Sequence, residues 1–232
     1  MVTGRNMHLF ENSILNGFIE EREVDTELNK LLGIDDQEIL VEVLNRAIAK
    51  WRGAITPNHP ATAKGDDFYN HSVVALREML KPFGFAPLSK SNVQLTINKE
   101  RGVAIYCCRG DERIGISEGK PRTLRARGDC TLNLLGLSED TDPTSLDLFP
   151  SDPELRLADF DVWVLLTYID QSGGRSSFRA ELSHPKSHTK GFINSFDKRI
   201  ILNTTSRDVV EEKSGSESFN DAIDFDLPEK TA

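Results

Sequence analysis

A run of basic residues in the middle of the chain is the segment best suited to bind anions. Guanidinium groups offer paired N–H donors that match the oxygens of phosphates and carboxylates. The run contains no aromatic side chain on which a nucleobase would stack. We interpret this run as a hairpin arm that binds anions, either on an acidic protein surface or on nucleic acid. The alternative is an arm that is simply solvated, or that forms ion pairs with the acidic segment 138–161. Its cations are Arg113, Lys120, Arg122, Arg125 and Arg127.

Carboxylates beside the longest apolar segment form a second candidate site. Asp159 and Asp161 precede that segment, and Glu181 lies in the next one. This order resembles metal-dependent nucleases of the restriction-endonuclease class, in which an acid on one strand and a Glu-x-Lys on the next hold a metal and activate water. Here the second element reads Glu181-Leu-Ser183, without the lysine. The resemblance implies a nuclease-like enzyme as an alternative to a binding protein.

The histidines and cysteines do not form a recognisable site. His184 and His188 are four residues apart, a spacing that suits zinc, but no third ligand lies near them, so solvated loop histidines are expected. Cys107 and Cys108 are adjacent in a predicted strand and must face opposite sides of it. With Cys130 they make three cysteines without a Cys-x-x-Cys pair. We therefore assign no metal, no cofactor and no catalytic residue, and we expect no disulfide framework.

The end of the chain places apolar residues among aspartates. Such a segment typically docks into a hydrophobic groove with a basic rim. The run Asp224-Phe-Asp-Leu-Pro228 is similar to the acidic tails of bacterial single-stranded-DNA-binding proteins, which implies recruitment of a protein partner; those tails end at Pro-Phe, whereas this one continues to Ala232. The alternative is a segment that packs on its own domain. The candidate partner-binding residues are Phe219, Ile223, Asp224, Phe225, Asp226 and Leu227.

The elements that must position these residues change from helices to strands along the chain. Apolar residues at helical spacing predict helices over 36–52, with Asp35 as its cap, and over 67–81; a third helical pattern covers 9–32 and is broken near Gly17. From residue 93 onward the pattern predicts strands joined by hairpin-length connections. The predicted strands are 93–97, 103–108, 113–117, 130–135, 160–169, 176–182 and 199–202.

These elements predict an α+β fold, with an N-terminal helical unit packed on a mainly antiparallel β-sheet and followed by a disordered acidic C-terminal tail. The expected regions are a helical part over 1–88, a β-rich part over 89–203 and the tail over 204–232. The tail has eight acids against three basic residues in residues 203–232 and few large apolar side chains before its end.

Composition limits the classes of function. The net charge of −9 is uneven, since residues 99–128 hold eight basic residues against four acids. No apolar run has the roughly 18 residues of a membrane span, and no signal-peptide pattern opens the chain, so a cytoplasmic protein that does not bind membranes is expected. We expect a non-enzymatic accessory subunit, adaptor or inhibitor in a larger bacterial or phage-type assembly that holds a protein partner. The alternatives are nucleic-acid binding, the nuclease-like enzyme and self-association through oppositely charged surfaces.

Overall fold

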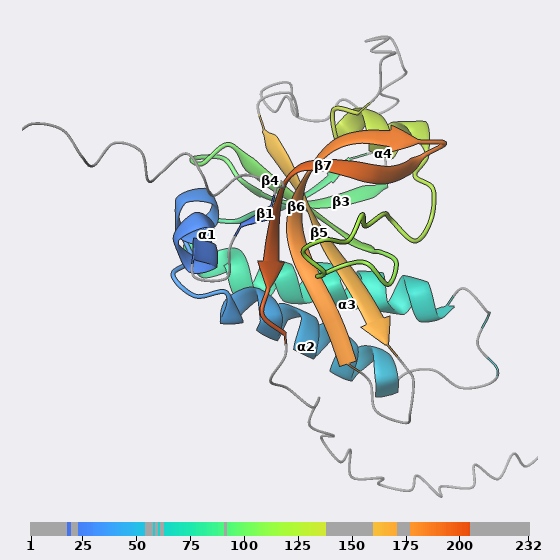
Figure 1. Cartoon of the computed structure of the whole chain (residues 1–232). Helices are drawn as coiled ribbons and strands as arrows, with labels where there is room; N and C mark the ends of the chain where they lie inside the picture. Colours follow the sequence, from blue (N-terminus) through green and yellow to red (C-terminus); the bar gives the residue numbers. More distant parts are fainter. Residues whose placement is uncertain are drawn as a thin grey trace, which may run out of the picture.

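The computed structural model describes residues 18–19, 23–53, 58, 60, 63–90, 92–137, 160–170 and 177–204. Helices come first and strands dominate from residue 86 onward (Figure 1). The elements in chain order are β1 (Phe18–Ile19), α1 (Val24–Leu32), α2 (Glu38–Gly53), α3 (Ala63–Leu80), the 3-10 helix η2 (Lys81–Phe83), β2 (Ala86–Lys90), β3 (Val93–Asn98), β4 (Val103–Arg109), α4 (Asp129–Leu134), β5 (Asp161–Asp170), β6 (Ser177–Thr189) and β7 (Phe192–Leu202).

The N-terminal helices form where the sequence places apolar residues three or four positions apart. α1 ends at Gly33, whose φ of 77° suits a residue without a Cβ. α2 begins just after Asp36, whose Oδ1 accepts the backbone N–H of Glu38 at 2.8 Å. The predicted cap, Asp35, instead accepts a hydrogen bond from the side chain of Asn29. The helices predicted over 36–52 and 67–81 are thus confirmed, with α3 beginning four residues earlier than expected.

The strands form one seven-stranded sheet in the order β1-β7-β6-β5-β4-β3-β2. Four neighbouring pairs are antiparallel, while β1–β7 and β4–β5 are parallel. Because β4 and β5 are parallel neighbours, the chain must cross over between them, and residues 110–160 form this connection. The predicted α+β fold with a mainly antiparallel sheet is confirmed.

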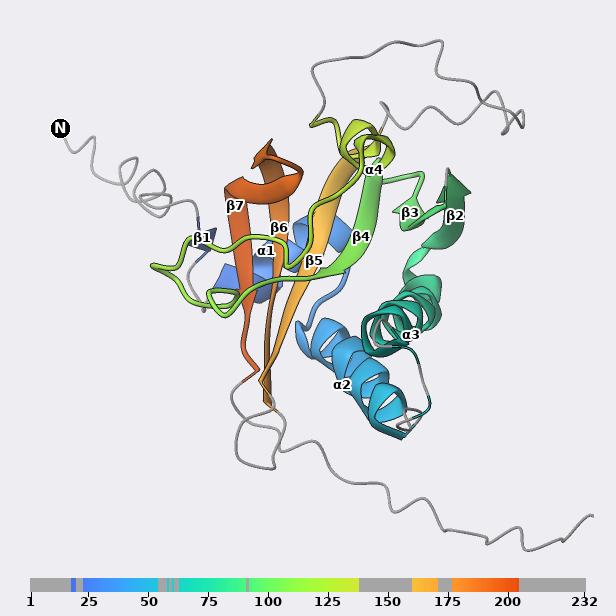
Figure 2. The ribbon, with the colours of Figure 1, turned by 90° about the vertical axis from the view of Figure 1, so that its right-hand side faces the viewer.

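Each face of the sheet carries its own apolar cluster. Ile105, Trp163 and Leu165 point toward α1, α2 and α3, which cover one face. Tyr106 and Val164 point the other way, toward α4 and the segment before it. Neighbouring residues alternate between the two clusters because successive side chains of a strand point to opposite faces. Figures 1 and 2 show α2 and α3 side by side against the sheet, with α4 near its opposite end.

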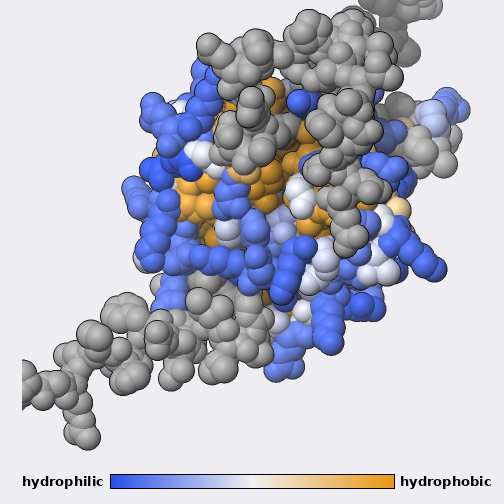
Figure 3. Space-filling model, turned by 90° about the horizontal axis from the view of Figure 1, so that it is seen from above, coloured by the Kyte–Doolittle hydropathy of each residue, from blue (hydrophilic) through white to orange (hydrophobic). Residues whose placement is uncertain are grey.

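The second cluster is covered less completely than the first by the described residues. Figure 3 views the molecule from the end at which α4 lies and shows apolar surface framed by hydrophilic side chains. The partly exposed apolar residues that pack against this cluster include Leu134, Leu137, Phe160 and Phe196.

Two predicted strands are wrong. Residues 130–135 lie in and just after helix α4, because Leu132 and Leu135 are both buried and are three residues apart, a spacing that puts them on one side of a helix. Residues 113–117 form part of an irregular loop, so the predicted hairpin arm is reduced to one antiparallel bridge at its base, between Gly110 and Thr123. The carbonyl oxygens of Ile114 and Ile116 accept hydrogen bonds from arginine side chains instead of a neighbouring strand.

Other boundaries also differ from the prediction. Residues 18–19 form strand β1 where a helical pattern was predicted, and β2 was not predicted. β6 and β7 are much longer than expected, so His184 and His188 lie in a strand. Nearly all of the predicted tail, from residue 205 onward, lies outside the described residues. Among the helices that the structure describes, none has the length and apolar character required to cross a bilayer.

Candidate functional site

The predicted basic residues lie on one irregular segment, residues 110–128, which we call the basic loop. It leaves the end of β4, crosses the sheet face opposite α1–α3 and leads into α4. Backbone hydrogen bonds attach its second half to the sheet. The N–H of Leu124 donates to Arg109 (2.9 Å), that of Thr123 to Ile193 (3.0 Å) and that of Arg127 to Gly191 (2.7 Å). The loop therefore has a defined path across the strands.

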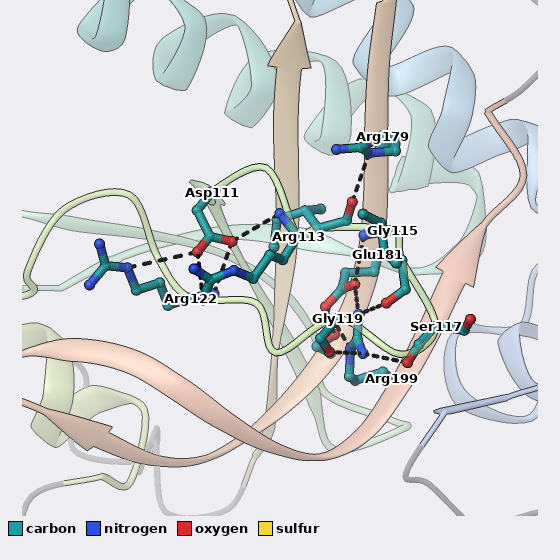
Figure 4. A network of polar contacts seen from close by, with 12 residues as sticks. Asp111, Arg113, Gly115, Ser117, Gly119, Arg122, Arg179, Glu181 and Arg199 are labelled. Carbon is teal, nitrogen blue, oxygen red and sulfur yellow. Dashed lines mark hydrogen bonds and ion pairs between the residues drawn. The ribbon is translucent and has the colours of Figure 1, made fainter.

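A buried ion pair lies beneath the first half of the loop. Glu181 on β6 is completely buried, and Arg199 on β7 is 6% exposed. The Arg199 guanidinium contacts both carboxylate oxygens, at 2.5 Å and 3.1 Å (Figure 4). Glu181 also accepts hydrogen bonds from the Ser183 hydroxyl (2.9 Å) and the Gly115 N–H (3.0 Å). A buried carboxylate is tolerated here because its oxygens are paired and hydrogen-bonded.

Arg199 also holds the loop itself. Its nitrogens donate to the carbonyl oxygens of Ile116 (3.1 Å), Ser117 (3.3 Å) and Gly119 (3.0 Å). Arg179, on β6, donates to the carbonyl oxygen of Ile114 at 3.0 Å, with its Nη2 on that of Glu112. Two arginines of the sheet thus bind five carbonyls between residues 112 and 119, and they fix the loop where no strand pairing does.

Gly115 allows this close approach. Its φ is +71°, and a Cβ on it would lie 2.9 Å from the Cβ of Arg179. A larger residue would therefore be strained in backbone conformation and would push the loop away from β6. Close contact between loop and sheet depends on this glycine.

Two of the predicted cations share one acid. Asp111 is buried, and its Oδ2 lies 3.8 Å from Arg113 Nη1 and 3.7 Å from Arg122 Nε (Figure 4). Its Oδ1 accepts the backbone N–H of Arg113 at 3.2 Å. The Arg122 guanidinium also lies over the ring of Phe192, 5.1 Å from its centroid. Both guanidinium groups remain about half exposed, so Asp111 orients them without removing them from solvent.

The other two predicted arginines line a cavity. Arg125 and Arg127 meet Arg109, the last residue of β4, around a volume of about 380 Å³ that we call the arginine pocket. Lys120 is exposed on the loop and does not line this cavity. Sequence reasoning missed Arg109, although an arginine that ends a buried strand next to a glycine is a usable signal. The remaining lining residues used below are Gly65, Asp66, Phe68, Tyr69, Tyr106 and Leu165.

The two thiols in the pocket wall are not nucleophiles. Burial raises the pKa of Cys107 to about 12 and that of Cys108 to about 11. Nearby charged groups change these two pKa values less than burial does. The thiolate is the reactive form, so at neutral pH both sulfurs are protonated and weakly reactive. They belong to the wall of the cavity and supply no covalent chemistry.

The predicted carboxylate cluster does not assemble. Asp161 accepts a hydrogen bond from Trp163 Nε1 (2.8 Å) and contacts His184 (2.7 Å) on the helix-covered face. Glu181 points to the other face and is occupied by Arg199. Asp159 lies outside the described residues. Since the two described acids are on opposite faces, they cannot hold one metal ion between them.

The two histidines also remain separate. His184 lies between Asp161 and Asp197, with its ring nitrogens 2.7 Å and 2.6 Å from their carboxylates. His188 accepts the backbone N–H of Gly191 at the β6–β7 turn. Within the described part of the chain, no group of three His, Cys, Asp or Glu residues is arranged to hold a metal.

The partner-binding residues predicted at the chain's end, 219–227, lie outside the described residues. Compared with known proteins, the chain matches no family model, no curated protein and no solved structure.

Proposed function

We propose that this protein is a non-enzymatic binding protein, and that the basic loop is the surface on which it holds a protein partner. The observation that carries the proposal is that a loop fixed by buried contacts exposes large apolar side chains among its cations. Ile116 is 41% exposed and Leu124 is 47% exposed. Arg122 and Arg125 flank Leu124 in the sequence. Arginine next to apolar anchors is typical of the energetically important centre of protein interfaces.

A protein partner suits this surface better than a nucleic acid does. Asp111 partly neutralises Arg113 and Arg122, which lowers the positive potential that would attract a phosphate backbone. No aromatic side chain lies in residues 110–128 to stack on a base. The complementary partner therefore presents acidic side chains around an apolar ridge.

Preorganisation supports a binding role. A loop that must be ordered on binding costs roughly 0.5–1.5 kcal/mol for each side chain that it immobilises. Here Arg199 and Arg179 hold the backbone before any partner arrives. The tail residues 219–227 are the second contact in this proposal, since they combine acids with apolar anchors.

Affinity capture with altered loops tests the proposal. Tagged wild-type protein is compared with Ile116→Ser/Leu124→Ser, and retained proteins are identified by mass spectrometry. Covering half of each apolar side chain contributes on the order of 1 kcal/mol per residue, so the double variant should bind about 30-fold more weakly. A chain ending at residue 210 measures the contribution of the tail.

Arg46→Gln is the matched control, because Arg46 is an exposed arginine on α2, far along the chain from the basic loop, and pairs with Glu42 at 3.0 Å. The proposal requires that the wild type and this control both retain certain proteins that the loop variant loses. The loop variant must also keep the melting temperature of the wild type. Identical lists from all variants would refute it. Fluorescently labelled single- and double-stranded DNA and RNA, titrated at low salt, test the nucleic-acid alternative.

A further inference from the structure

The arginine pocket exists because β3 and β4 separate before β4 ends. Their pairing stops at Leu95 opposite Tyr106, and residues 107–109 pair with β5 but not with β3. The N–H of Gln94 instead donates to the hydroxyl of Tyr69 on α3, at 3.3 Å. Figure 2 shows β2 and β3 set apart from the upright strands β4 to β7. The cavity therefore opens at the carboxyl ends of two parallel strands, a position where open sheets commonly bind ligands.

The cations of the pocket have donors to spare. Among the described residues, none accepts a hydrogen bond from the side chain of Arg109, and its Nε is buried. The buried Nε of Arg127 is likewise without an acceptor, while its Nη1 donates to the Tyr106 hydroxyl at 3.1 Å. Burial, followed by the charge of Arg125, lowers the pKa of Arg109. Buried polar groups are normally hydrogen-bonded, so these donors are suited to a bound anion.

Arg125 adds positive charge at the start of a long helix. Its guanidinium lies 3.7 Å from the position that a Cβ on Gly65 would occupy, in the first turn of α3. The N-terminal end of a helix is itself electropositive, so a cation there is unfavourable unless an anion shares the space. Asp66 is the acid in the pocket wall. Three arginines and one aspartate leave a formal charge of +2.

We propose that the arginine pocket binds an organic phosphate. A phosphate monoester carries about −1.5 to −2 charges at neutral pH, which matches the charge of the pocket better than a single carboxylate does. Guanidinium groups bind phosphate oxygens through paired hydrogen bonds. The volume of about 380 Å³ exceeds the needs of the phosphate alone and falls in the range of small-molecule sites. Phe68 and Leu165 supply an apolar wall for the organic body.

Calorimetric titration of the full-length protein at constant ionic strength tests the site. The probes are phenyl phosphate, inorganic phosphate and benzyl alcohol, which separate the charge from the organic body. Phenyl phosphate should bind at one site, more tightly than inorganic phosphate, and benzyl alcohol should not bind. Arg125→Gln changes an exposed side chain and should weaken phenyl phosphate binding about tenfold, as loss of one charged hydrogen-bonding group does. Arg46→Gln should leave binding unchanged.

Arg109→Met separates binding from a structural role. Because the guanidinium has no acceptor in the described part of the chain, the ligand-free variant should melt at or above the wild-type temperature while losing at least tenfold in affinity. A lower melting temperature with unchanged affinity would mean that Arg109 is structural, and it would overturn the assignment. Failure of phenyl phosphate to saturate a site at millimolar concentration would also overturn it. If inorganic phosphate binds as tightly as phenyl phosphate, the pocket is a simple anion site and the proposal of an organic phosphate is refuted. The titration contains no protein partner, so it fails or succeeds independently of the proposed protein-binding role.

Discussion

Replacing Arg199 with methionine should detach the basic loop and destabilise the whole protein. Methionine retains an apolar stem of similar shape but no donors. The change removes both contacts with Glu181 and the hydrogen bonds to three loop carbonyls. Glu181 is completely buried, and among the described residues it would keep the Ser183 hydroxyl and the Gly115 N–H as its donors. The variant therefore leaves a buried negative charge without a counter-charge.

The size of the effect follows from this unpaired charge. Removing one partner of a buried pair costs about 3–5 kcal/mol, and the carbonyls lose less because water replaces their donors at the surface. For a protein of this size each kcal/mol lowers the melting temperature by roughly 2–4 °C, so a decrease on the order of 10 °C is expected. Glu181→Met/Arg199→Met removes both charges and should recover most of this loss. The stability that the double variant still lacks relative to the wild type measures the contribution of the lost hydrogen bonds to the loop.

Urea unfolding and thermal melting of the wild type, the single variants and the double variant give the coupling energy between the two residues. Limited trypsin digestion gives an independent measure, since the bonds after Arg113 and Arg122 become cleavable once the loop leaves the sheet. The reasoning is refuted if Arg199→Met stays within about 1 kcal/mol of the wild type, well below the cost of a broken buried pair. It is also refuted if the double variant is no more stable than Arg199→Met.

Two further predictions concern cysteines and the attachment of α1. Ellman's reagent at pH 8 should modify only the exposed Cys130 in the native protein, because burial raises the pKa of Cys107 to about 12 and that of Cys108 to about 11. All three cysteines should react after denaturation. Rapid reaction of more than one cysteine in the native protein would contradict this prediction. The hydrogen bond from Lys198 holds the pKa of Glu27 below its ordinary 4.5, so this contact stabilises the folded state above pH 4.5 and is lost as pH falls through the folded-state value. Glu27→Gln should therefore lower the free energy of unfolding by about 0.5–1 kcal/mol at pH 7 and by less in acid. Urea titrations of both proteins at the two pH values measure this difference. If the difference is as large in acid as at pH 7, the ion pair is not the cause of the destabilisation.

Elements with a long local pattern were predictable from the sequence. α2 repeats buried residues at helical spacing over 16 residues, and β5 has 10 residues dominated by β-branched and aromatic side chains. Short elements were not predictable in the same way. β1 has two residues and exists because Phe18 and Ile19 pair with Arg199 and Ile200 on β7. α4 has six residues, and its conformation follows from how Leu132 and Leu135 pack against the sheet.

The candidate site was predictable as a set of cations and not as an arrangement. The sequence identifies the arginines of residues 113–127, but it does not show which residues each of them meets. Asp111 orients Arg113 and Arg122, whereas Arg125 and Arg127 join Arg109 in a separate cavity. The periodicity of the sequence does not reveal that Glu181 forms an ion pair with Arg199, because that contact depends on the register between β6 and β7. Charge alone therefore predicts one basic segment and does not show that its arginines lie in two separate arrangements.

The buried pair beneath the basic loop also has a consequence for the order of folding. Gly115 and Ile116 contact Glu181 and Arg199 across 66 and 83 positions of the chain, while the pair itself spans 18. The β6–β7 hairpin closes locally, and the loop has nothing to dock on until that hairpin exists. The first half of the loop should therefore become ordered after the hairpin and open before it, with exchange of its amide hydrogens preceding that of β5. Under the proposed function, partner binding then depends on an intact hairpin, because a chain that has not completed β6 and β7 has no basic surface to present.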